Sequence, residues 1–94
     1  MTSTFIYPEV IEKIRTTCTK HVAGLASIDD FQQVIQYGEA AIIAIEEKRF
    51  CNFLTDVEGE IELIKYTVEE GDQLPESQRL AKKVLLRISA IDQK

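Results

Sequence analysis

The chain has 94 residues, a length that suits one domain able to remove about 60–70% of its unfolded surface from water. Hydrophobic residues make up 45% of the sequence and charged residues 29%, ordinary values for a globular protein that exclude a disordered chain. The net charge is −5, and the longest apolar run, Ala40 to Ile45, is far too short to span a membrane.

The start of the chain and its cysteines indicate a compartment. The first ten residues, MTSTFIYPEV, lack the basic start and long apolar segment of a signal peptide, so we expect a soluble, cytoplasmic protein that does not contact a membrane. Cys18 and Cys51 are 33 residues apart, without a CxxC or zinc-type pattern. We expect packed thiols; a disulfide or a metal pair is the alternative.

A first helix is predicted over residues 8–23. Pro8 suits the first helical position because its φ is fixed and it has no N–H to leave unpaired, and Gly24 suits the end of the helix. Between them, apolar residues recur at spacings of three and four and predict a buried stripe: Ile11, Ile14, Cys18, Val22 and Leu25.

A second helix is predicted over residues 28–46. Ser27 and Asp30 form a variant of the capping box, in which a hydroxyl precedes an acid by three residues. Gly38 lies on the apolar face of this helix, where it lowers helix propensity but permits a close helix crossing.

A third helix is predicted over residues 49–70, with an apolar stripe running from Phe50 to Val68. This stripe is offset by roughly 100° from that of the second helix, so one straight helix would turn half of its apolar residues away from the core. A tight turn is therefore expected between Glu46 and Arg49.

The fourth helix is predicted over residues 75–92, beginning at Pro75 after a stop at Gly71. Its stripe comprises Leu80, Ala81, Val84, Leu85, Ile88 and Ile91. The sequence contains no strand pattern and no repeat. Four helices with short connections predict an all-α, antiparallel four-helix bundle, a single helical domain over residues 1–94.

The negative charge is concentrated in one segment. The window from Asp56 to Asp72 holds seven acids and one base, a net charge of −6; because the whole chain carries −5, the remainder sums to +1. Nucleic acid binding requires a basic surface, so a direct nucleic-acid partner is not expected. A basic protein partner fits better.

Residue types used in catalysis are present but poorly grouped. His21 is the only histidine, and we interpret it as a helix-end residue favoured by the C-terminal dipole. Glu58, Glu60 and Glu62 alternate along a helix, so Glu60 points away from the other two. Cys18 and His21 are three residues apart, but no third group to orient them is visible. We expect no enzyme activity, no metal and no cofactor.

The acidic helix has a second apolar set on its outward side, which includes Leu63 and Tyr66. An aromatic and an aliphatic side chain inside a charged rim are typical of the centre of a protein interface. Burial of this set inside the bundle and a homodimer contact are the alternatives. The predicted partner-binding residues are Asp56, Glu58, Glu62, Leu63, Tyr66, Glu69, Glu70 and Asp72.

The first helical hairpin contains a small-residue turn followed by Ser–x–x–acid–Phe at a helix start, in the segment Gly24-Leu25-Ala26-Ser27-Ile28-Asp29-Asp30-Phe31. This pattern resembles the opening of the colicin D-type immunity proteins, and the resemblance covers about a third of the chain. These proteins are small cytoplasmic helical bundles that neutralise a tRNA-cleaving toxin domain with acidic side chains. The resemblance implies an inhibitor of a basic, nuclease-like toxin domain, with the Asp56 to Asp72 cluster as the matching property; no toxin-contacting residue can be carried over individually.

A homodimeric structural or regulatory bundle is the competing hypothesis. In it, Leu63, Tyr66 and Leu86 would pack between subunits. The basic residues Arg79, Lys82 and Lys83 of one chain would then meet acids of the other.

Overall fold

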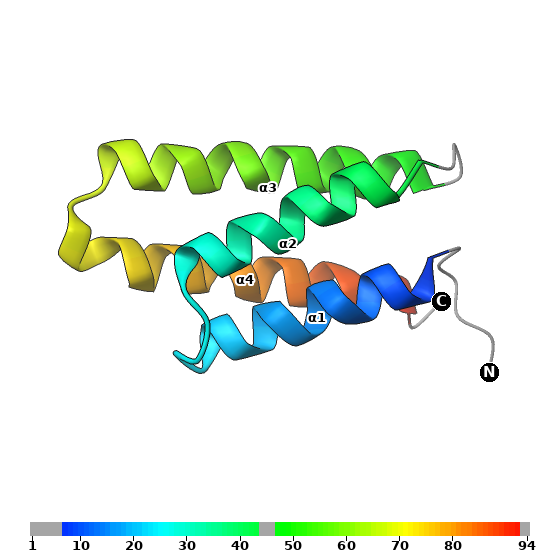
Figure 1. Cartoon of the computed structure of the whole chain (residues 1–94), viewed down its shortest axis with the longest axis horizontal. Coiled ribbons are helices and arrows are strands. Elements are labelled where there is room, and N and C mark those ends of the chain that lie inside the picture. The colour runs from blue at the N-terminus through cyan, green and yellow to red at the C-terminus, as the bar shows by residue number, and fades with distance from the viewer. Residues whose placement is uncertain (1–6, 44–46, 93–94) are drawn as a thin grey trace.

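The predicted all-α, antiparallel four-helix bundle is confirmed by a computed structural model, which describes residues 7–43 and 47–92 (Figure 1). The four helices are α1 (Pro8–Val22), α2 (Ile28–Ala41), α3 (Lys48–Thr67) and α4 (Glu70–Asp92). Each helix packs against its neighbours in the chain, α1 also packs along α4, and α2 touches α4 across the bundle. The α1–α2 and α3–α4 connections lie at the same end of the molecule (Figure 1). None of the described helices combines the length and apolar composition of a membrane span.

The α1–α2 hairpin has the start and stop signals that the sequence predicts. Pro8 is the first residue of α1, and Gly24 adopts the left-handed conformation with φ 81°. The N–H groups of Gly24 and Leu25 donate to the carbonyls of His21 and Lys20, which is the Schellman pattern. The capping box of α2 is also present, with both Ser27–Asp30 hydrogen bonds at 3.0 Å.

The predicted end of the second helix at residue 46 is wrong, although the predicted break before α3 is present. Ile42 is extended and donates its N–H to Gly38, so α2 ends at Ala41. The extended backbone buries the Ile42 side chain and leaves Ile43 exposed. Residues 44–46, part of the predicted helix end and turn, lie outside the described residues.

The predicted boundary between the third and fourth helices is also wrong. The third helix ends at Thr67, and α4 begins at Glu70, so Gly71 and Pro75 both lie inside α4. Gln73 explains the tight connection. Its amide donates to the carbonyls of Lys65 and Val68, which satisfies the C-terminal end of α3. Gln73 itself lies in the helical turn that precedes Pro75.

The core follows the predicted stripes except at one end. Ile14, Phe31, Leu54, Ile61, Val84 and Ile88 are fully buried, one or more from each helix. Leu25, predicted in the stripe of the first helix, is 79% exposed because the Schellman turn directs the chain away from the core. The side chain of Ile91 lies outside the described residues.

Candidate binding surface

Leu63 and Tyr66, the predicted apolar centre, are not used by the bundle itself. Tyr66 is 86% exposed and Leu63 is 61% exposed, whereas the residues on the opposite side of α3, such as Ile61, are buried. The alternative of burial within the chain is therefore wrong. A tyrosine and a leucine on the surface of so small a domain are available for a contact with another molecule.

The predicted acids lie along α3 and at the start of α4. Asp56, Glu58 and Glu62 are on α3, Glu69 is in the connection, and Glu70 and Asp72 are in the first turn of α4. All are exposed except Glu58, which is half-buried. They are therefore spread from the middle of α3 to the first turn of α4 and do not converge on one point.

Two charged side chains of this segment make polar contacts with α2, at the seam between α2 and α3. Gln36 Nε2 donates to Glu58 Oε2 at 2.7 Å, and Lys65 pairs with Asp29 while donating to Gln32 Oε1 at 2.6 Å. Glu60 lies on the other side of α3, 4.0 Å from Lys83 Nζ of α4. The predicted divergence of Glu60 from Glu58 is thus present, and the acids fan around the helix.

Glu39, which sequence reasoning missed, joins the acids at this seam. Its Oε1 accepts a hydrogen bond of 2.9 Å from the Thr55 hydroxyl. The Glu39 carboxyl also interacts with that of Glu58. Burial of the carboxyl, with a hydrogen bond to Glu58, raises the pKa of Glu39 to about 6. Hydrogen bonds from Glu39 and Gln36 lower the pKa of Glu58. In mildly acidic solution the proton therefore resides on Glu39, which faces the ionised Glu58 carboxylate.

The Glu39 carboxyl is expected to make stability depend on pH. Its folded pKa lies above the ordinary value of 4.5, so its contribution is fully present below pH 4.5 and is lost as the pH rises through 6. Glu39→Gln removes this loss. Between pH 4.5 and 7, the free energy of unfolding of the variant should rise relative to that of the wild type by up to about 1 kcal/mol. This figure is reduced for the solvent exposure of the group.

Urea denaturation at the two pH values measures this gain. Glu9→Gln, at an exposed position on α1, is the matched control and should track the wild type. A constant difference in the free energy of unfolding between Glu39→Gln and the wild type would show that the seam carries no such proton.

The prediction that His21 lies at a helix end is confirmed, because it is in the last turn of α1. Its side chain, however, is fully buried in the bundle. Its Nδ1 is 2.8 Å from the Ala26 carbonyl, its Nε2 is 2.8 Å from Ser77 Oγ, and its ring stacks on Phe31. Because a carbonyl only accepts, Nδ1 carries the proton. His21 therefore joins the first loop to α4.

The two cysteines are free, as expected. Cys18 is buried, and burial raises its thiol pKa to about 12, so it is not a thiolate nucleophile at neutral pH. Cys51 is half-buried, with its sulfur 3.7 Å from the Glu39 carbonyl. Within residues 7–43 and 47–92, no group of three or more His, Cys, Asp or Glu side chains is placed to hold a metal ion.

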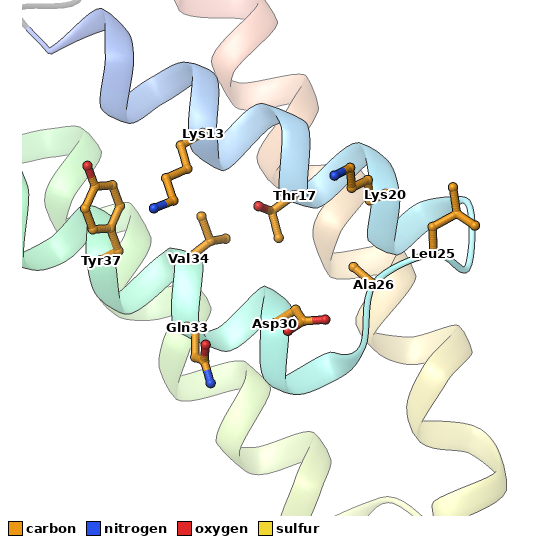
Figure 2. A pocket seen from close by; sticks show the side chains of 9 residues that line it. All are labelled: Lys13, Thr17, Lys20, Leu25, Ala26, Asp30, Gln33, Val34 and Tyr37. Atoms are coloured by element: carbon orange, nitrogen blue, oxygen red, sulfur yellow. The ribbon is translucent and has the colours of Figure 1, made fainter.

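A groove between α1 and α2, about 470 Å³ in volume, was not predicted (Figure 2). Lys13, Thr17 and Lys20 line its α1 side, and Lys13 Nζ lies 4.4 Å from the centre of the Tyr37 ring on α2. Asp30 contributes a carboxylate, but this group accepts the Ser27 N–H of the capping box, which lowers its pKa. The groove thus mixes both charges and shows no preference for one ligand.

Comparison with known proteins adds no relative: no family model, no curated protein and no solved structure matches this chain.

Proposed function

We propose that this protein is a small inhibitory binding protein of the immunity or antitoxin kind, which blocks a basic, nuclease-like toxin domain without catalysis of its own. The observation that carries the proposal is the exposure of Tyr66 and Leu63 on the helix with the acidic segment. The partner would contact this face of α3 and the acidic start of α4.

The two apolar side chains would supply the affinity. Tyrosine is among the residues enriched at interface hot spots, because its ring covers a large area at little cost in conformational entropy. Tyr66 and Leu63 are three residues apart on one helix, so one partner surface can cover both. Energetically weaker polar contacts around them would exclude water.

The acids around this centre would supply the rate and the discrimination. A nuclease needs a positive surface to hold phosphates, and an acidic inhibitor is steered toward that surface as it approaches. Glu62 and Glu69 flank Tyr66 in the sequence, and both are exposed. The similarity of the first hairpin to colicin D-type immunity proteins supports a toxin domain as the kind of basic partner.

Charge reversal tests the proposal on a basic, nuclease-like protein recovered by pull-down with this chain from its native host. Glu62→Lys/Glu69→Lys should slow association by roughly tenfold and weaken its dependence on salt, because steering acts on the association rate. Stopped-flow or surface plasmon resonance at two ionic strengths gives both quantities.

Glu9→Lys/Glu12→Lys on α1 makes the same change in net charge away from α3 and is the control. The association rate of this control should fall much less than that of Glu62→Lys/Glu69→Lys. Equal losses in the two variants, or unchanged binding by the first, would contradict the assignment of this face.

A further inference from the structure

A second surface runs between α3 and α4. A groove of about 430 Å³ lies between these helices. Its apolar lining comes from Leu63, Ile64 and Val68 at the end of α3 and from Leu80 of α4. Ile64 and Val68 are only half-buried, so the groove exposes apolar surface that the bundle leaves uncovered.

The two helices that border this groove carry ridges of opposite charge, although Glu76 of α4 also lines the groove. Asp56 and Glu60, one turn apart, form the acidic ridge on α3. Arg79, Lys82 and Lys83 form the basic ridge on α4, and all are exposed. Leu86, 72% exposed, follows one turn after Lys82 and Lys83.

Contacts within one chain leave part of this charge unpaired. Arg79 Nη1 lies 3.6 Å from Glu76 Oε1 of the same helix. Glu60 and Lys83 are 4.0 Å apart at exposed positions, and an ion pair of this kind contributes at most about 1 kcal/mol. Asp56 and Lys82 form no ion pair with any described residue. Both ridges therefore have charge available for another molecule.

We propose that the α3–α4 face binds the same face of a second copy of this chain, with the two-fold axis parallel to the two helices. In a two-fold dimer, each patch meets its own copy after a rotation of 180°. Rotation about an axis along the groove places the acidic ridge of each chain over the basic ridge of the other. Rotation about an axis across the helices would place like charges together, at a cost.

Leu63 lies at the apolar centre of this arrangement. Because it lines the groove, an axis along the groove brings the Leu63 side chains of the two copies close together. The dimer does not depend on the proposed inhibitory function. It does cover Leu63, so a second copy and a basic partner would compete for this residue.

Two charge-reversed variants test the arrangement. Lys82→Glu/Lys83→Glu makes both ridges acidic, and Asp56→Lys/Glu60→Lys makes both basic. Each variant alone should dimerise at least about tenfold more weakly than the wild type, since its two ridges repel their copies. An equimolar mixture should form a heterodimer of nearly wild-type affinity, because both pairs of ridges are then complementary.

Sedimentation equilibrium at low salt, over micromolar to millimolar concentrations, measures these constants. Lys13→Glu/Lys20→Glu, on α1, changes the charge as much as the first variant and should leave dimerisation unchanged; circular dichroism verifies that each variant is folded. A wild type that stays monomeric at the highest concentration would overturn the proposal. A mixture that dimerises no better than its components would overturn it too, and neither result bears on the binding of a basic partner.

Discussion

Replacing His21 with alanine is expected to lower the free energy of unfolding by about 3 kcal/mol. The side chain is fully buried, so its loss leaves a cavity against Phe31. It also leaves the Ala26 carbonyl and the Ser77 hydroxyl without the ring nitrogens that they now meet at 2.8 Å. Because these two partners belong to the first loop and α4, the loss loosens two connections at once.

Guanidinium denaturation measures this effect, and a double-mutant cycle with Ser77→Ala apportions it. Ser77→Ala should cost only about 1 kcal/mol by itself, because the alanine removes one hydroxyl and leaves the ring in place. The coupling between the two changes should be near 1 kcal/mol. A loss below 1 kcal/mol in His21→Ala would mean that the histidine is not the buried link described here.

Gly38→Val is expected to destabilise the bundle by about 2–3 kcal/mol. A Cβ at this position would lie 2.8 Å from Ile14 Cδ1 and 2.8 Å from Leu54 Cδ1. Both of those side chains are fully buried, on α1 and α3, so neither can move without displacing its own neighbours. Gly38→Ala should destabilise the bundle less than Gly38→Val. Its higher helix propensity, a gain of up to about 1 kcal/mol, offsets part of the cost of crowding.

Gly59 supplies the control for this effect. It is also inside a helix, but a Cβ there would meet nothing within 4 Å. Gly59→Ala should therefore stabilise the protein by about 0.5–1 kcal/mol in the same thermal or chemical denaturation experiment. Similar changes at the two glycines would show that α2 does not cross α1 and α3 as closely as described.

The fold could be predicted from periodicity, and two helix boundaries could not. Apolar spacing places Ile14, Leu54 and Val84 in the core, and the cap signals at Ser27 and Gly24 act locally, so the sequence alone reveals them. The start of α4 depends on the Gln73 amide reaching back to the end of α3. That is a contact between two helices, and Pro75 gives a misleading local signal.

In the candidate surface, too, features set by the local sequence could be predicted, and contacts between helices could not. Helical phase alone predicts that Leu63 and Tyr66 face outward from α3. The contacts at the α2–α3 seam were not predictable, because Glu39 is 19 residues from Glu58 and meets it only when the helices pack. The link from His21 to Ser77 spans 56 residues and was hidden for the same reason.

Titrating a basic nuclease domain recovered by pull-down with this chain from its native host, with its nuclease activity as the readout, tests the central claim most directly. The account predicts inhibition that is complete at one chain per partner molecule. Tyr66→Lys, at an exposed site where stability should change by less than about 0.5 kcal/mol, should lose this inhibition. Full inhibition by Tyr66→Lys, or no effect of the wild type at any ratio, would contradict the account.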